Sequence, residues 1–70
     1  MNILIEEPEE FNPVDLIRLA QYHDSSLRYR HFAIVFKCEL HTIQRWMCGI
    51  AKPNKAYRLW AAELKQKWGL

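Results

Sequence analysis

The chain has 70 residues, half of them apolar and 13% aromatic, so it can fold as one small domain and lacks the composition of a disordered segment. Its longest unbroken apolar run, "FAIVF", is too short to span a membrane, and "MNILIEEPEE" has neither the basic start nor the apolar core expected of a signal peptide. The net charge is only +2, and its distribution along the chain is more informative than its size.

Residues 1–11 are predicted to form an acidic arm before the folded domain. Residues 1–15 hold five acidic side chains and no basic one, whereas residues 16–70 hold all ten lysines and arginines and three acidic residues. The apolar triplet "ILI" could pack on the domain or form a short strand, and Pro8 argues against a helix in the arm. A basic body with an acidic tail is typical of proteins that bind polyanions, although a solvated basic surface explains it equally well.

The first helix is predicted to begin at "FNPVD" and to end near "HDSS". Asn12 is a typical N-cap, Pro13 suits the first helical position, and Asp15 places a negative charge in the first turn. The helical spacing places on or beside one face Val14, Leu16, Ile17, Leu19, Ala20 and His23.

Ser25 or Ser26 is predicted to cap a second helix over residues 27–36. The side chains expected on its inward face are Tyr29, Phe32, Ala33 and Phe36, and those expected to point away are Arg28 and Arg30.

The segment 37–39 is predicted to break this helix, and a third helix is predicted over residues 40–48. Its inward residues are expected to be Ile43, Trp46 and Met47, and Gly49 can adopt the left-handed conformation that ends it.

A second break at "KPN" makes Asn54 the expected N-cap of a last helix, over residues 55–68. The residues at helical spacing are Tyr57 or Arg58, Ala61, Leu64 and Trp68, with Leu59 and Trp60 adding apolar width. The aromatic residues expected in the core are Phe32, Phe36, Trp46, Tyr57 and Trp60. The fold class predicted from these elements is all-α, with four or five short helices in a domain over residues 12–70.

The two cysteines do not predict a metal site or a disulfide. Cys38 and Cys48 form a C-x₂-H-x₆-C pattern with His41, which lacks the paired spacing of zinc ligands. Cys38 lies in an apolar setting where a free thiol behaves as a small hydrophobe. We therefore expect no metal and no cofactor.

The turn at residues 37–39 has the plan of a helix-turn-helix, with the motif over about residues 28–49. Two short helices joined by such a turn must cross steeply, and Ala33 is the small residue that permits their close approach. We expect Cys38 to fill the turn from inside, and Ile43 and Trp46 to hold the second helix against the first.

The sequence "FAIVFKCELHTIQRWMCGIAKPNKAYRLWAAEL" resembles the lambda-repressor/Cro-like (Xre-type) helix-turn-helix family. The family frame "LAxxLGVSxxTISRWExGxxxPs" lies over residues 32–54 without a gap: "FA" takes the place of "LA", "TIQRW" matches "TISRW", and Gly49 and Pro53 take the places of the glycine and proline. The chain departs from the frame where Lys37 replaces a turn glycine and is expected to take a positive φ. It departs again where Glu39 replaces a Ser or Thr cap, although its carboxylate could still cap the helix, and where Leu40 replaces a polar residue.

The resemblance implies a sequence-specific DNA-binding protein, a small repressor-like transcriptional regulator. We expect no enzymatic activity, because the sequence has no glycine-rich phosphate loop and no credible pairing of a nucleophile with a base. It implies that the helix over residues 39–48 enters the major groove of double-stranded DNA. The residues in place to contact bases are Glu39, Leu40, His41, Gln44 and Arg45, and those in place to contact phosphates are Arg28, Arg30, Thr42, Lys52 and Lys55.

A protein-interaction adaptor on the same scaffold (antitoxin-like, anti-repressor or polymerase-associated) is the alternative, since Glu39 and Leu40 suit a protein partner as well as DNA. The acidic arm could hold such a partner or fold over the basic face. A homodimer is also open, through the arm or through a surface of the last helix at Trp60, Leu64, Trp68 and Leu70. The expected location is the cytoplasm or nucleoid of a bacterium, and a phage-encoded origin suits the resemblance equally.

Overall fold

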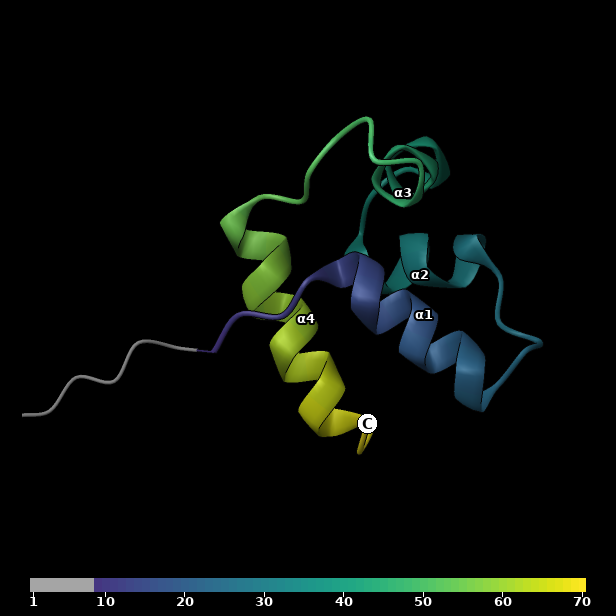
Figure 1. Ribbon diagram of the computed structural model, residues 1–70, viewed down its shortest axis with the longest axis vertical. Helices are drawn as coiled ribbons and strands as arrows, with labels where there is room; N and C mark the ends of the chain where they lie inside the picture. Colours follow the sequence, from purple (N-terminus) through teal and green to yellow (C-terminus); the bar gives the residue numbers. More distant parts are fainter. Residues whose placement is uncertain (1–8) are drawn as a thin grey trace, which may run out of the picture.

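The computed structural model describes residues 9–70, and its regular structure consists of four α-helices (Figure 1). They are α1 (Pro13–His23), α2 (Tyr29–Phe36), α3 (Leu40–Met47) and α4 (Lys55–Lys67), and these residues form no strand. The prediction of an all-α fold with four or five short helices is confirmed for residues 9–70, which form four helices and no strand. Most of the expected arm, residues 1–8, lies outside the described residues. Within the part described, no helix is both long enough and apolar enough to cross a membrane.

Two of the helices begin where the capping residues predict. The Asn12 side-chain oxygen accepts a hydrogen bond of 3.0 Å from the backbone N–H of Val14, and Pro13 occupies the first turn of α1. The Asn54 side-chain oxygen likewise accepts a bond of 3.1 Å from the N–H of Tyr57 at the start of α4. Each bond satisfies a backbone donor that a helix start leaves without a partner.

Helix α2 begins at Tyr29, two residues after the predicted start, and neither serine caps it. The Ser26 N–H and hydroxyl both donate to the carboxylate of Asp24, at 3.0 and 2.6 Å, in a local turn. The cap is supplied instead by His31, whose Nδ1 accepts a 2.9 Å bond from the backbone N–H of Arg28. This is half of a capping box, with an imidazole where Glu or Gln is usual.

The turn between α2 and α3 is closed by backbone hydrogen bonds. Lys37 has φ 55°, as expected, and the N–H of Cys38 donates to the carbonyl of Ala33 at 3.0 Å. This is the arrangement that ends many helices, with a residue other than glycine in the left-handed position. In Figure 1, α3 is seen almost along its axis while α2 lies across the view, so the two helices cross steeply.

Gly49 ends α3 in the same way, with φ 75° and the N–H of Ile50 donating to the carbonyl of Arg45 at 3.0 Å. The predicted C-terminal glycine of this helix is therefore confirmed.

The core lies between all four helices, and every helix contributes to it. Its fully or nearly buried apolar residues are Leu16, Ile17, Ala20, Phe32, Ala33, Phe36, Ile43, Trp46, Ala61 and Leu64. The rings of Phe36 on α2, Trp46 on α3 and Tyr57 on α4 meet edge to face, with centroids 4.9 to 6.2 Å apart. This contact joins α4 to the α2–α3 pair.

Several positions predicted to face inward are exposed or only half-buried. Trp60 is 37% exposed, because only its edge meets α2, where its Nε1–H donates to the carbonyl of Val35 at 3.1 Å. His23 is exposed at the end of α1 with its ring against Tyr22, and Trp68 is exposed beyond the end of α4. Cys38 is half-buried, so it fills the turn only in part.

The burial of Ala33 on α2 generates a stability prediction. Ala33 is 7% exposed, so Ala33→Leu forces extra methyl groups into a packed crossing and should lower the free energy of unfolding by about 1–3 kcal/mol. Its neighbour Ile34 is 74% exposed, so the control Ile34→Leu should change it by no more than about 0.5 kcal/mol. Urea unfolding of both variants measures the difference, and an unchanged Ala33→Leu midpoint would contradict this helix crossing.

Candidate functional site

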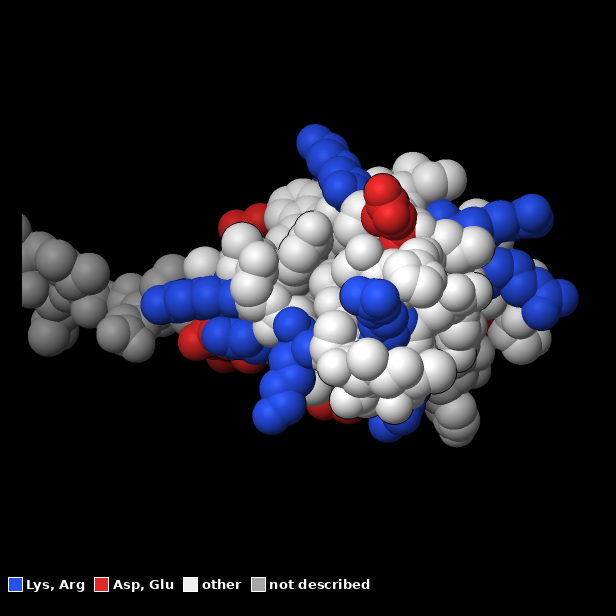
Figure 2. Space-filling model, turned by 90° about the horizontal axis from the view of Figure 1, so that it is seen from above, with Lys and Arg blue, Asp and Glu red and all other residues white. Residues whose placement is uncertain are grey.

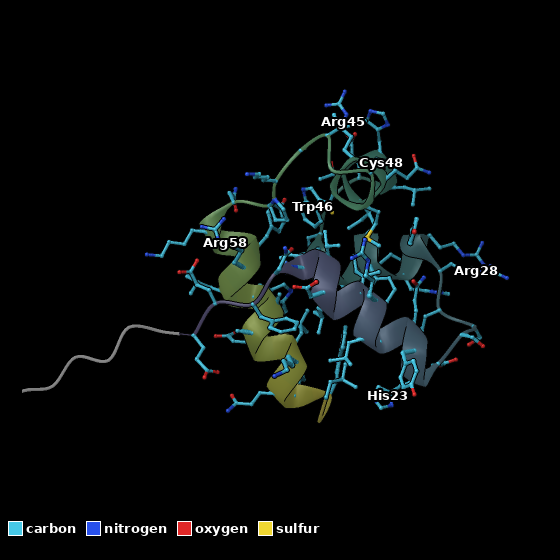
Figure 3. All side chains as sticks on the ribbon, viewed as in Figure 1. His23, Arg28, Arg45, Trp46, Cys48 and Arg58 are labelled. Atoms are coloured by element: carbon cyan, nitrogen blue, oxygen red, sulfur yellow. The ribbon has the colours of Figure 1, made fainter. Side chains whose placement is uncertain are left out.

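The outward face of α3 carries most of the predicted base-contacting residues. Because Ile43 and Trp46 are buried, the helix turns His41, Gln44 and Arg45 toward solvent, and all three are exposed. Figure 3 shows Arg45 pointing away from the body of the protein and Trp46 lying on the side of α3 toward α4. The three exposed side chains lie within a little over one helical turn, so they can meet one surface together.

An open cleft of about 570 Å³ joins this face to the start of α2. Its lining residues are Gln21, Arg28, Tyr29, Arg30, Leu40 and Gln44. The structure thus brings together two predicted base contacts, Leu40 and Gln44, and two predicted phosphate contacts, Arg28 and Arg30. The cleft offers paired guanidinium donors beside a side-chain amide and an apolar side chain.

Gln21 and Tyr29 belong to this cleft and were not predicted as site residues. Gln21 reaches across from α1 and donates from Nε2 to the carbonyl of Leu27 at 3.2 Å, so it holds the loop that leads into α2. Its position depends on how α1 packs beside that loop, and no local sequence signal marks it.

The other predicted contacts lie outside the cleft. Lys52 is in the segment between α3 and α4, Lys55 is at the first position of α4, and both are exposed. Thr42 is half-buried on α3. Glu39 is the exposed N-cap residue of α3, but its carboxylate makes no capping hydrogen bond, so the expectation of a side-chain cap is wrong.

The side chain of Arg58 is hydrogen-bonded to other groups of the protein. Its Nε donates to a carboxylate oxygen of Glu10 at 2.8 Å and its Nη1 donates to the carbonyl of Pro53 at 2.7 Å (Figure 3). The hydrogen bond from Arg58, with the nearby charges of Arg58 and Lys55, lowers the pKa of Glu10 below its ordinary value. Both partners are about 40% exposed, so the ion pair contributes little stability. The separate bond from Arg58 to Pro53 holds the segment that leads into α4.

The charged side chains do not cover the α3 side evenly. Figure 2 views the molecule from this side: lysine and arginine side chains project around its rim, basic atoms also lie near its middle, and an acidic side chain lies among largely uncharged atoms. Such a surface can contact a negatively charged partner at its edges and near its middle, with uncharged atoms between these basic groups.

No group of three or more His, Cys, Asp or Glu side chains is placed to hold a metal ion within residues 9–70. Cys48 is exposed and Cys38 is half-buried, and burial, with the charge of Glu39, raises the pKa of the Cys38 thiol. A raised pKa disfavours the thiolate, which is the form that binds metals and acts as a nucleophile.

No protein-family model matches the chain, and no curated protein and no solved structure matches it significantly. Its function is therefore inferred from its own residues and their geometry.

The unusual cap at His31 leads to a prediction about the stability of the fold. His31→Ala removes the acceptor for the Arg28 N–H and should lower the free energy of unfolding by about 1 kcal/mol. His31→Gln offers an amide oxygen at the same place and should recover most of this loss. His41 is exposed on α3, so His41→Ala is the matched control and should unfold like the unmodified chain. Equal midpoints for His31→Ala and His41→Ala in thermal unfolding would refute the cap.

Proposed function

We propose that this chain is a DNA-binding module of the lambda-repressor/Cro-like helix-turn-helix class, and that α3 enters the major groove. The observation that carries the proposal is the packing of α3. Ile43 and Trp46 are buried in the core, and Gln44 lines one cleft together with Arg28 and Arg30. A groove-reading helix needs exposed polar side chains flanked by phosphate-binding cations.

The proposed base contacts follow from side-chain chemistry. Gln44 can bond adenine through two hydrogen bonds, and His41 or Arg45 can donate to guanine or to a phosphate. At the start of α3, Glu39 can accept from the cytosine amino group, and Leu40 can contact a thymine methyl.

The proposed phosphate contacts surround these residues. Arg28 and Arg30 approach the backbone from the start of α2, Thr42 from α3, and Lys52 and Lys55 from the segment before α4 and its first turn. Such contacts fix the position of the protein on the duplex without distinguishing sequences.

We infer from the same geometry that the module acts as a small transcriptional regulator with repressor-like binding. One copy covers few base pairs, so two copies on half-sites about one helical turn apart supply the specificity. Of the residues suggested for a dimer surface on the last helix, Leu64 is 3% exposed and belongs to the core, so it cannot contact a partner. Trp60 and Trp68 are exposed and can.

A protein-interaction adaptor is the second candidate, and exposed apolar residues favour it. Leu40 is 43% exposed and Ile50 is 76% exposed, and neither has a partner in the core. The exposed Leu40 directly follows the acidic Glu39, and this combination suits a basic protein surface.

Titration of unrelated duplex DNA at two salt concentrations tests the proposal. A DNA-binding module should bind tightly at low salt and lose affinity steeply as salt rises, because bound cations are released from the duplex. If the protein shows no salt-sensitive binding to any duplex, the DNA-binding proposal is wrong and the protein-interaction adaptor is the better account.

Gln44 and Arg28 should give different signatures on DNA. After selection of a preferred site from random duplexes, Gln44→Ala should cost about 1–3 kcal/mol on that site and relax the preference at one base pair. Arg28→Ala is the matched control: it should weaken binding to all sequences alike and reduce the slope of log affinity against log salt by about one unit. A Gln44→Ala loss that is equal on every sequence would show that this residue does not read a base.

Glu39 separates the two candidate functions. On DNA its charge opposes the phosphates, so Glu39→Ser should strengthen non-specific binding and blur sequence preference, as measured by competition with unrelated duplex. If Glu39→Ser leaves DNA binding unchanged and abolishes association with a protein partner, the adaptor is the better account.

A further inference from the structure

Glu39 and Leu40, at the start of α3, present a hydrogen-bond acceptor and an apolar side chain next to each other. Glu39 is the exposed N-cap residue, and its carboxylate makes no hydrogen bond to the first turn of the helix. Leu40 is 43% exposed, and among the described residues it is not one of the apolar side chains packed against the core. Both side chains are therefore free to contact a ligand.

The cleft beside α2 limits what Leu40 can contact. Within residues 9–70, Leu40 is the one aliphatic side chain in its lining, together with the guanidinium groups of Arg28 and Arg30. The inference that follows rests on the proposed entry of α3 into the major groove, where two arginines bind the phosphate backbone. The apolar group on the base edges of that groove is the C5 methyl of a pyrimidine, which is carried by thymine and by 5-methylcytosine.

Glu39 distinguishes between these two pyrimidines. Next to the methyl, thymine presents the O4 acceptor, whereas 5-methylcytosine presents the N4 amino donor. An ionised carboxylate only accepts hydrogen bonds, so Glu39 suits the amino group and is repelled by O4. Unmethylated cytosine offers the same amino group but leaves Leu40 without an apolar partner. Of these bases, 5-methylcytosine alone matches both side chains.

The positions of the two residues allow them to meet one base. The N-terminal residues of a recognition helix contact base edges, and Glu39 and Leu40 are consecutive at that end of α3. The amino group and the methyl are likewise on adjacent ring carbons of the base. Gln44 lies four residues further along α3, about 6 Å, so the base that it contacts lies within about two base pairs.

We propose that Glu39 and Leu40 together read one 5-methylcytosine in the major groove, with an adenine read by Gln44 within about two base pairs. Glu39 accepts a hydrogen bond from the N4 amino group, and Leu40 covers the C5 methyl. Arg28 and Arg30 hold the neighbouring phosphates. The preferred ligand of the module is then duplex DNA with methylated cytosine.

Selection from two random duplex libraries, one made with cytosine and one with 5-methylcytosine in its place, tests the proposal. In a selected duplex, 5-methylcytosine at the read position should bind about fourfold tighter than cytosine, which is the effect of one buried methyl. It should bind about tenfold tighter than a thymine–adenine pair at the same position, because O4 replaces the amino donor.

Three results would overturn the proposal, and they can be told apart. If duplexes bind but methylation tightens binding at no position, the methyl readout is wrong and DNA binding stands. If thymine binds as tightly as 5-methylcytosine, Glu39 does not read the amino group. If no duplex binds at all, the proposed function fails together with this inference.

Variants of the two residues should lose different preferences. Leu40→Ala should bind methylated and unmethylated duplexes equally, whereas Leu40→Met keeps an apolar side chain and should keep part of the preference. Glu39→Gln can also donate, so it should lose the preference over thymine and keep the preference over cytosine. Ile34 is 74% exposed on α2 and does not line the cleft, so Ile34→Ala is the matched control and should keep both preferences. An equal loss of methyl preference in Ile34→Ala and Leu40→Ala would show that Leu40 does not contact the methyl.

Discussion

The close approach of α2 and α3 is the constraint on which the rest of the structure depends. Ala33 is buried on α2, and the turn after α2 places Lys37 in a left-handed conformation that costs a residue with a side chain about 1–2 kcal/mol. The bond from the Cys38 N–H to the Ala33 carbonyl offsets that cost. With the crossing fixed, Trp46 faces the Phe36 and Tyr57 rings, and the opposite side of α3 can only face solvent.

Features with local causes could be predicted from the sequence. Asn12 and Asn54 cap helices because a side-chain oxygen reaches a backbone N–H two or three residues on, and that geometry needs no distant partner. Gly49 ends α3 for an equally local reason, whereas the positive φ of Lys37 is expected only from the resemblance to the family frame. The exposed position of Gln44 follows from helical spacing once Ile43 and Trp46 are assigned to the core.

Features that depend on competition or on distant packing could not be predicted. Ser26 has the right type of side chain to cap α2, but its hydroxyl is hydrogen-bonded to Asp24 instead. The N-terminal cap of α2 comes from His31, which lies within the helix. The spacing on α4 puts Trp60 at the edge of the apolar stripe, and only the position of α2 decides how far it is covered. The cleft needs Gln21 from α1, which no motif connects with the α2–α3 turn.

Chemical-shift mapping during titration with duplex DNA tests the central claim most directly, since it locates the binding surface without altering the protein. The account predicts that the earliest and largest amide shifts fall at residues 40–45 and 28–30, with little change at the exposed Glu63 and Lys67 on α4. Shifts concentrated on α4, or none at low salt, would contradict a groove-binding role for α3.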